Sequence, residues 1–471
     1  MRMVRRALPI SLLVTLFAAS SLSSSGASAA DVGFASPVRV SANDDQSAAE
    51  PSIRAARDGT LYISAPTGLG GARIQEKGRG GDLLWRSDDD GKTWEFLGNY
   101  DPAQGGGDSD IAPDREGVLW ASGLTLANTT VGISTDRGET FRNNPVGSLE
   151  TVVDRQWIET YRAEPFAFLT TGQISDRRII LSRIERSAGD YPVVTKTVTV
   201  SGEQEEYQWP GEIAVDETGG LVYVTYNTDG EPERNDQIVV TRSDLKLERN
   251  KRFTVTTTKG DSFDSFSAID VDQAGNVYVV WTERRPQGPK AKFGKTNSYL
   301  SVSKDKGQSW STPVKLNTRM RTTTFPWIVA GSKGRVAVAY YGIRQRGPSP
   351  ENVFHETRKV LPKWKVFVAY SLNADRAGAT FRNVRAVPRF IHEGNLCTSG
   401  TGCAPGTRDL LDFFQLDLDA CGKIVITYTD NSTDVVEKDG TRSTNNQEYV
   451  SFVGQDSGPS FYTQPLNPEV C

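Results

Sequence analysis

Short segments in which apolar and polar residues alternate follow one another along almost the whole chain, and turns with Gly and Asp separate them. Residues 267–316 show one complete unit: AIDVDQAG, NVYVVWTE, a long loop, SYLSVSKDKGQSW and STPVKL. Alternation with a period of two is typical of β-strands. Self-similarity with a period of roughly 40 to 60 residues is typical of propellers and solenoids. The pattern therefore predicts an all-β fold built from repeated four-stranded units.

Seven segments can begin such a unit, and each is followed by a plausible second strand. This count predicts a β-propeller of seven four-stranded blades. A six-bladed alternative stays open, because the third unit and the junction of the last unit with the N-terminus have weaker patterns. Residues 34–41, FASPVRVS, resemble the fourth strand at 310–317, WSTPVKLN, so we expect them to complete the last blade. The predicted first strands begin at Pro51, Asp110, Gln156, Glu212, Ser267, Pro326 and Asp412.

A turn motif, S-x-D-x-G-x-[T/S]-[W/F], recurs between the predicted third and fourth strands. It covers residues 87–94, 134–141 and 303–310, and degenerate copies lie at 375–381 and 456–461. In such a turn the Asp accepts hydrogen bonds from nearby backbone N–H groups, and the Gly adopts a positive φ. The aromatic residue is expected to pack beneath the hairpin. We therefore expect the rings of Trp94, Phe141 and Trp310 to be buried.

This repeat resembles the Asp-box, or BNR repeat, of sialidases and related secreted glycoside hydrolases. The resemblance extends over nearly the whole mature chain and implies a propeller. It implies a structural role for the motif aspartates, because the Asp-box lies on the outer part of a blade. Sialidases share an early Arg-Ile-Pro motif whose arginine binds the substrate carboxylate. This chain has Glu50-Pro51-Ser52-Ile53 at the equivalent place, which argues against sialic acid as the substrate.

The N-terminus has the pattern of an export signal. Three arginines among the first six residues precede an apolar run at residues 7–22, and an Ala-Ser-Ala sequence then offers a cleavage site. We predict a signal peptide over residues 1–29 and a single propeller domain over 30–471. No later run approaches the roughly 18 apolar residues of a membrane span, so we expect a secreted monomer without a membrane partner. A formal net charge of −4 argues against nucleic acid as a partner.

All four cysteines lie in the last quarter of the chain, and an even count in an exported protein favours disulfides. Cys397 and Cys403 flank a short loop, whereas Cys471 is the last residue and could attach the tail to the turn that contains Cys421. A zinc site is the alternative, but neither pair has the two-residue spacing and no histidine is interleaved. We predict the bonds Cys397–Cys403 and Cys421–Cys471, and neither a metal nor a cofactor.

Candidate functional residues follow from the predicted topology, because the innermost strands of a propeller surround a central channel and ligands usually bind where those strands begin. Glycoside hydrolysis needs two carboxylates, or a tyrosine nucleophile with a carboxylate. Arginine suits an acidic sugar, and aromatic rings suit sugar faces. The candidate catalytic residues are Asp108, Asp110, Asp154, Glu212, Asp412 and Tyr341. The candidate substrate-binding residues are Arg155, Trp157, Glu159, Trp327, His392 and Arg408.

Two functional hypotheses follow. The first is a secreted, sialidase-like glycoside hydrolase that acts on a glycan, with an acidic glycan as one candidate and a polysaccharide lyase as a close variant. The second is a non-catalytic carbohydrate- or protein-binding propeller, because fold does not imply function. The sequence has no Ser-His-Asp order, HExxH motif, Walker motif or dinucleotide fingerprint in a suitable context. Nucleophilic proteases, zinc peptidases and nucleotide enzymes therefore lack support.

Overall fold

The computed structural model describes most of the chain beyond residue 30. The described residues are 31–42, 46–67, 81–101, 107–125, 127–161, 164–203, 208–228, 236–262, 265–285, 295–345, 361–398, 403, 408–432 and 448–471. The predicted signal peptide at 1–29 lies outside them. Within the described residues, no helix is long and apolar enough to cross a membrane.

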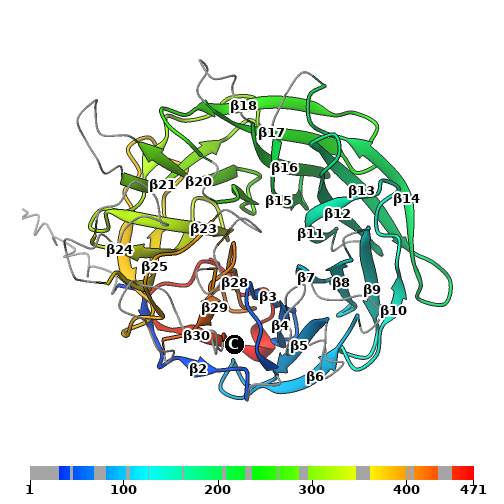
Figure 1. Ribbon diagram of the computed structural model, residues 1–471, viewed down its shortest axis with the longest axis horizontal. Helices are drawn as coiled ribbons and strands as arrows, with labels where there is room; N and C mark the ends of the chain where they lie inside the picture. The colour runs from blue at the N-terminus through cyan, green and yellow to red at the C-terminus, as the bar shows by residue number, and fades with distance from the viewer. Residues whose placement is uncertain are drawn as a thin grey trace, which may run out of the picture.

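Seven antiparallel sheets are arranged as the blades of a ring, which confirms the predicted β-propeller and its seven blades (Figure 1). Blade 1 comprises β3 (Ser52–Ala55), β4 (Leu61–Pro66), β5 (Asp82–Ser87) and β6 (Glu95–Asn99). Blade 2 comprises β7 (Ser109–Pro113), β8 (Leu119–Leu124), β9 (Thr129–Ser134) and β10 (Arg142–Asn144). Blade 3 comprises β11 (Val153–Tyr161), β12 (Phe166–Gln173), β13 (Arg178–Arg186) and β14 (Pro192–Thr199). Blade 4 comprises β15 (Gln208–Asp216), β16 (Leu221–Thr228), β17 (Gln237–Asp244) and β18 (Lys251–Thr257).

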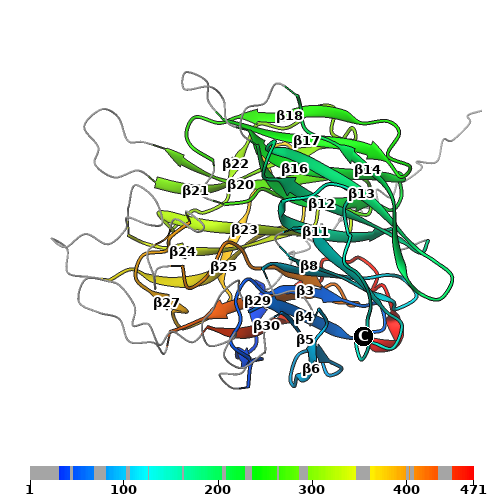
Figure 2. The ribbon, with the colours of Figure 1, turned by 45° about the vertical axis from the view of Figure 1, so that its right-hand side comes forward.

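Blade 5 comprises β19 (Ala268–Val271), β20 (Val277–Arg285), β21 (Lys295–Ser303) and β22 (Val314–Lys315). Blade 6 comprises β23 (Thr322–Ala330), β24 (Val336–Ile343), β25 (Lys363–Ser371) and β26 (Arg382–Arg385), and β27 (His392–Glu393) also pairs with β25. Blade 7 comprises β28 (Leu416–Leu418), β29 (Ile424–Asp430) and β30 (Tyr449–Ser457), with β1 (Gly33–Phe34) and β2 (Val38–Arg39). A short 3-10 helix, η5 (Pro468–Val470), precedes the C-terminus. The first strands lie around the axis and fourth strands such as β6 and β18 lie at the periphery (Figure 1, Figure 2).

The two ends of the chain meet in blade 7. Val38 pairs with Phe452 and Arg39 with Ser451, so the N-terminal segment forms the outer edge of the last blade. This pairing confirms the expectation drawn from residues 34–41. The long edge of β30 is thereby covered by two strands of two residues each, and such short edge strands pair less readily with another chain.

The predicted first strands begin within four residues of the observed ones. At β28 the predicted start lies four residues before the observed one. At β11, β15 and β23 it lies three or four residues after the observed one, and these three differences have one cause. Each strand contains a register shift near its start, and the predicted start falls at the end of that shift or inside it. The bulge interrupts the period-two pattern, so the sequence pattern is clear only beyond it. The second strands lie between two neighbouring blades and are buried throughout, as in β8 and β24.

The aspartate of the turn motif accepts the same hydrogen bonds in all three complete copies. At residues 303–310, Asp305 Oδ1 accepts from Ser303 Oγ at 2.8 Å and from Ser309 N at 2.8 Å. Gly307 has a φ of 82°, which favours glycine. Trp310 Nε1 donates to Gly307 O at 3.0 Å. The aspartate therefore holds the turn closed and the ring lies across it.

The expectation that the three motif rings are buried was too strong, since Trp94, Phe141 and Trp310 are half-buried. Each ring contacts apolar groups on one side only. Trp94 packs on Phe452 of blade 7 with ring centroids 5.2 Å apart, and Phe141 packs on Tyr100 at 5.3 Å. The hairpins lie at the outer edge of the blades, so the second face of each ring remains at the surface.

Asp305→Asn is expected to lower the free energy of unfolding by about 1 kcal/mol, because the amide cannot accept all the hydrogen bonds of the carboxylate. Urea unfolding measures this change. Asp90→Asn is the matched control, since Asp90 lies in the equivalent turn of blade 1 and is exposed. Equal stability of the two variants would show that the motif aspartate does not hold the turn.

Both predicted disulfides are present, Cys397–Cys403 and Cys421–Cys471. The second bond spans 50 residues and ties the C-terminal residue to the turn between β28 and β29. The tail is thereby attached to the blade that closes the ring.

Candidate functional site

Three carboxylates converge on the guanidinium group of Arg155. Its Nη2 lies 2.9 Å from Glu50 Oε1 and 3.2 Å from Asp412 Oδ2, and its Nη1 lies 3.2 Å from Asp108 Oδ1. Arg408 forms a further ion pair with Asp412. We call these five residues the strand-start cluster. Four of them, Asp108, Arg155, Arg408 and Asp412, were predicted from the sequence as site residues, and the structure brings them together.

The cluster forms because its members occupy similar positions in neighbouring blades. Glu50 and Asp108 lie just ahead of β3 and β7, Arg155 lies at the bulge of β11, and Asp412 lies ahead of β28. The backbone turns sharply at several of these points: φ is 52° at Glu50, 58° at Arg155 and 51° at Leu411. Positive φ is uncommon for residues other than glycine and costs about 1 to 3 kcal/mol. It therefore persists only where contacts with the surroundings offset that cost. The ion pairs hold these residues in place.

The inner part of the cluster is closed to solvent. Glu50 is 1% exposed, and burial raises its pKa to about 8, helped by the charges of Asp412 and Asp108 and opposed by that of Arg155. Burial also raises the pKa of Asp108, which shares a hydrogen bond with Glu50. Burial and mutual repulsion therefore disfavour the charged form of both carboxyl groups.

The outer part of the cluster reaches the surface. The side chain of Asp412 is 14% exposed and that of Arg408 is 30% exposed. Asp154, the residue before Arg155, is exposed. Arg408 Nε is a buried atom without a hydrogen-bond partner. A polar ligand at this face would meet the carboxylates of Asp412 and Asp154 and the exposed part of the Arg408 side chain.

An aromatic layer lies beneath Arg155 and separates the cluster from the rest of the axial channel. The guanidinium carbon is 4.6 Å from the centroid of Phe266 and 4.9 Å from that of Phe413. Trp157 and Trp327 belong to this layer, with centroids 5.9 Å apart, and both are fully buried. The structure therefore places these two predicted sugar-binding rings in the core, where they support Arg155 and offer no open face to a sugar.

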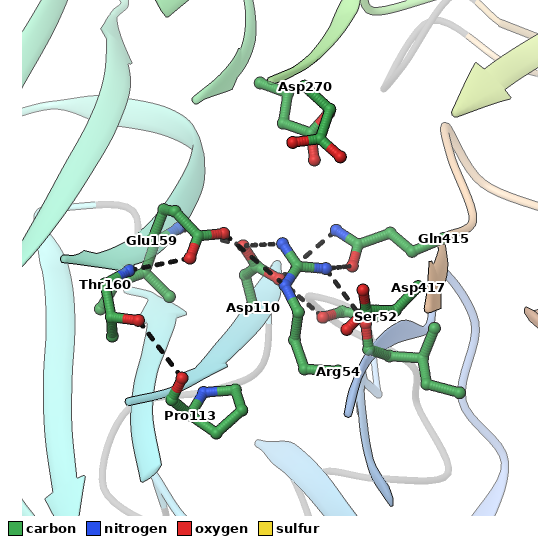
Figure 3. A network of polar contacts seen from close by, with 12 residues as sticks. Ser52, Arg54, Asp110, Pro113, Glu159, Thr160, Asp270, Gln415 and Asp417 are labelled. Atoms are coloured by element: carbon green, nitrogen blue, oxygen red, sulfur yellow. Dashed lines mark hydrogen bonds and ion pairs between the residues drawn. The ribbon is translucent and has the colours of Figure 1, made fainter. Parts of the chain in front are cut away.

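A second group of polar residues lines the axial channel on the other side of the aromatic layer. It surrounds a cavity of about 280 Å³ that extends toward the turns between the first and second strands. Figure 3 shows Arg54 beside Asp110, Glu159 and Gln415, and Asp270 facing them from across the channel. The side chains of this group that line the cavity are Arg54, Glu159, Glu212, Asp270 and Asp417.

Most carboxylates of this second group connect neighbouring blades. Asp110 accepts a hydrogen bond from Ile158 N at 3.0 Å, and Glu212 accepts one from Ile269 N at 3.1 Å. Each bond joins the first strand of one blade to the backbone of the next. In the same way, Asp270 accepts a hydrogen bond from Ala330 N at 2.6 Å. Asp417 accepts one from Ala55 N at 2.8 Å.

Burial raises the pKa of Asp270 to about 7 and that of Glu212 above its ordinary range. The candidate residues did not include Arg54, Asp270 and Asp417, because candidates were sought mainly at the starts of first strands and in the loops after second strands, and these three residues lie farther along the first strands. Charged residues in the interior of otherwise apolar first strands were the signal that could have found them, since such residues need a partner when buried.

Tyr341 and His392 lie away from both groups of acids. The ring of Tyr341 is fully buried and stacks on Phe414 with centroids 4.0 Å apart, and its Oη accepts a hydrogen bond from Thr429 N at 3.3 Å. His392 is buried beside the small disulfide loop, where its ring contacts Asn431 Oδ1 at 3.0 Å and Asn395 O at 3.1 Å. Both side chains are therefore buried and held by contacts within the protein.

Glu50→Gln is expected to flatten the pH dependence of stability between pH 4.5 and about 8. Because the pKa of Glu50 rises from 4.5 to about 8 on folding, the folded state binds the proton more tightly than the unfolded state. Its contribution to stability is complete below pH 4.5 and is lost as the pH rises, with a slope of at most about 1.4 kcal/mol per pH unit. Urea unfolding across this interval measures the slope. Glu95→Gln serves as the control, because Glu95 is exposed. Identical slopes for Glu50→Gln and wild type would contradict the raised pKa of Glu50.

Comparisons with known proteins found similar solved structures only. No protein-family model and no curated protein matches the chain. A Dyadobacter fermentans protein of unknown function has 14% identity over 90% of this chain and 99% of its own, with a TM-score of 0.48. An α-L-arabinofuranosidase from Fusarium graminearum has 14% identity over 66% and 93%, with a TM-score of 0.43. A leech intramolecular trans-sialidase has 10% identity over 90% and 70%, with a TM-score of 0.40. At these identities the comparisons assign no activity to this chain.

Proposed function

We propose that this chain is a glycoside hydrolase whose site is the strand-start cluster, with Asp412 and Asp154 as the carboxylates that touch the glycan. The observation that supports the proposal is the convergence of Glu50, Asp108 and Asp412 on Arg155 at the mouth of the channel. Perturbed carboxyl groups and strained backbone gather at functional sites more often than elsewhere. Both occur in this cluster.

The chemistry of glycoside hydrolysis fits the accessible groups. One carboxyl group protonates the leaving oxygen, and a carboxylate acts as base or nucleophile at the anomeric carbon. Asp412 is the accessible acid of the cluster, and the exposed Asp154 lies next to Arg155, so these two acids fill the two roles in the proposal. Arg155, Glu50 and Asp108 are positioning residues. They hold the Asp412 carboxylate in one orientation through Arg155 Nη2, and Glu50 Oε1 also accepts from Asp412 N at 2.6 Å.

Arg408 supplies the means to select a substrate. Its side chain is 30% exposed, and its Nη2 contacts Asp412. A guanidinium group donates strong, directed hydrogen bonds to carboxylate and hydroxyl oxygens. An acidic or strongly polar glycan is the substrate class that such a group favours.

Export from the cell belongs to the same proposal. Two disulfides are expected where the surroundings are oxidising, and the predicted signal peptide over residues 1–29 points the same way. A monomeric, secreted enzyme would meet glycans outside the cell.

A non-catalytic glycan- or protein-binding propeller is the second candidate. Glu50 and Arg155 are buried, and the charges of the cluster already compensate one another. Such an internally paired cluster would also suit a rigid binding platform. Incubation of the exported protein with a panel of aryl glycosides and acidic and neutral polysaccharides, followed by chromatography of the products, separates the two. Product release supports the hydrolase, and retention of an unchanged glycan supports the platform.

A further inference from the structure

Asp82, the first residue of β5, is a buried acid whose side chain has no bonding partner in the described part of the chain. The residue is 0% exposed, and both Oδ1 and Oδ2 lack a hydrogen-bond partner. Because an unpaired buried charge is very costly, this position requires either a proton or a positive ion.

Asp82 points toward a second buried acid across the junction of blades 1 and 2. Asp101 is 3% exposed. A Cβ atom built on Gly123 would lie 2.1 Å from Asp82 Oδ2 and 3.1 Å from Asp101 Oδ2. The two oxygens therefore converge on one small space, which is open only because residue 123 has no side chain. Asn99 Oδ1 fixes this arrangement by accepting from Asp82 N at 3.1 Å and from Asp101 N at 2.9 Å.

Among the residues that the structure describes, the charges that act on Asp82 are the negative ones of Asp101 and Asp108. Tyr100 is buried next to both acids. Ser109 Oγ lies within hydrogen-bond reach of the Tyr100 hydroxyl. Arg155 is engaged by Asp108, Glu50 and Asp412. Oxygen ligands with two carboxylates are what a hard divalent cation prefers.

We propose that Asp82 and Asp101 bind a calcium ion between blades 1 and 2. Calcium accepts irregular sets of oxygen ligands, including carboxylates, carbonyls, hydroxyls and water, whereas magnesium demands near-octahedral geometry. No group of three or more Asp, Glu, His or Cys ligands occurs among the residues that the structure describes, so neutral oxygens would complete the coordination. The site joins the end of β6 to the start of β5 and lies next to the segment that carries Asp108, and it does not depend on the proposed hydrolase activity.

The test measures calcium content and thermal stability in the full-length exported protein. Wild type, Asp82→Asn, Asp101→Asn and Asp114→Asn are dialysed against calcium, freed of unbound ion and analysed by atomic absorption. Each is then melted in calcium and in EDTA. Asp114→Asn is the matched control, because Asp114 is also a buried acid of blade 2 but its oxygens accept hydrogen bonds from Glu116 N, Val118 N and Trp120 Nε1.

Wild type and Asp114→Asn are expected to hold one more calcium ion per chain than Asp82→Asn or Asp101→Asn. Calcium is expected to raise the Tm of the first pair by several degrees over that in EDTA and to leave the second pair unchanged. Equal calcium content in wild type and Asp82→Asn would overturn the proposal. A stable Asp82→Asn variant whose wild-type parent binds no calcium would show instead that Asp82 is buried as the neutral acid.

Discussion

Asp412→Asn is expected to lower turnover of the glycan found in the screen by 10²-fold or more, the range of a lost acid–base or nucleophilic carboxylate. The amide keeps the shape of the side chain and a hydrogen-bond acceptor for Arg155. It cannot carry the negative charge that the proposed chemistry uses at this place. The measurement is kcat of the folded protein, with the Tm of each variant determined in parallel.

Asp110→Asn provides the contrast that makes this result interpretable. Asp110 is two residues from Asp108 but fully buried, and its carboxylate accepts from Ser52 Oγ at 2.6 Å and from Ile158 N at 3.0 Å. We therefore expect Asp110→Asn to lower the Tm and to leave kcat of the folded fraction nearly unchanged. The sequence alone suggested lost turnover for both variants. If Asp412→Asn retains full turnover, the strand-start cluster is not the catalytic site.

Arg155→Met is expected to cost about 3 to 5 kcal/mol of folding free energy, the largest loss of stability that we predict. Arg155 is the cation shared by Glu50, Asp108 and Asp412. Methionine has a similar length and can contact Phe266 and Phe413, so packing in the aromatic layer is largely kept. The loss arises because three carboxylates remain together without their common partner.

Urea unfolding of Arg155→Met at several pH values identifies the cause of the loss. As the pH falls, the carboxylates take up protons and their repulsion disappears, so the deficit relative to wild type should shrink. Arg178→Met is the control, since Arg178 lies in an exposed ion pair with Asp176 and should lose little. A deficit that stays constant with pH would attribute the loss to packing. It would contradict the claim that repulsion among the three carboxylates causes the loss.

The amino-acid sequence alone determined the architecture. Seven repeats with a period-two pattern, the turn motif at 303–310 and its copies, and the strand-like residues 34–41 predicted a closed seven-bladed ring. Both disulfides followed from the positions of four cysteines. These features are readable because alternation, turn chemistry and loop length are local properties that act within one blade.

The three-dimensional arrangement of the acids was decided by the tertiary structure. Asp108 and Asp110 look equivalent in the sequence, yet Asp108 contacts Arg155 and Asp110 connects blades 2 and 3. Arg155 and Trp157 are likewise two residues apart, and the bulge in β11 puts one in the charged cluster and the other in the aromatic layer. Which layer a side chain enters depends on bulges, on positive φ angles and on the neighbouring blade. These determinants involve residues up to several hundred positions apart, such as Glu50 and Asp412, so no local pattern in the sequence encodes them.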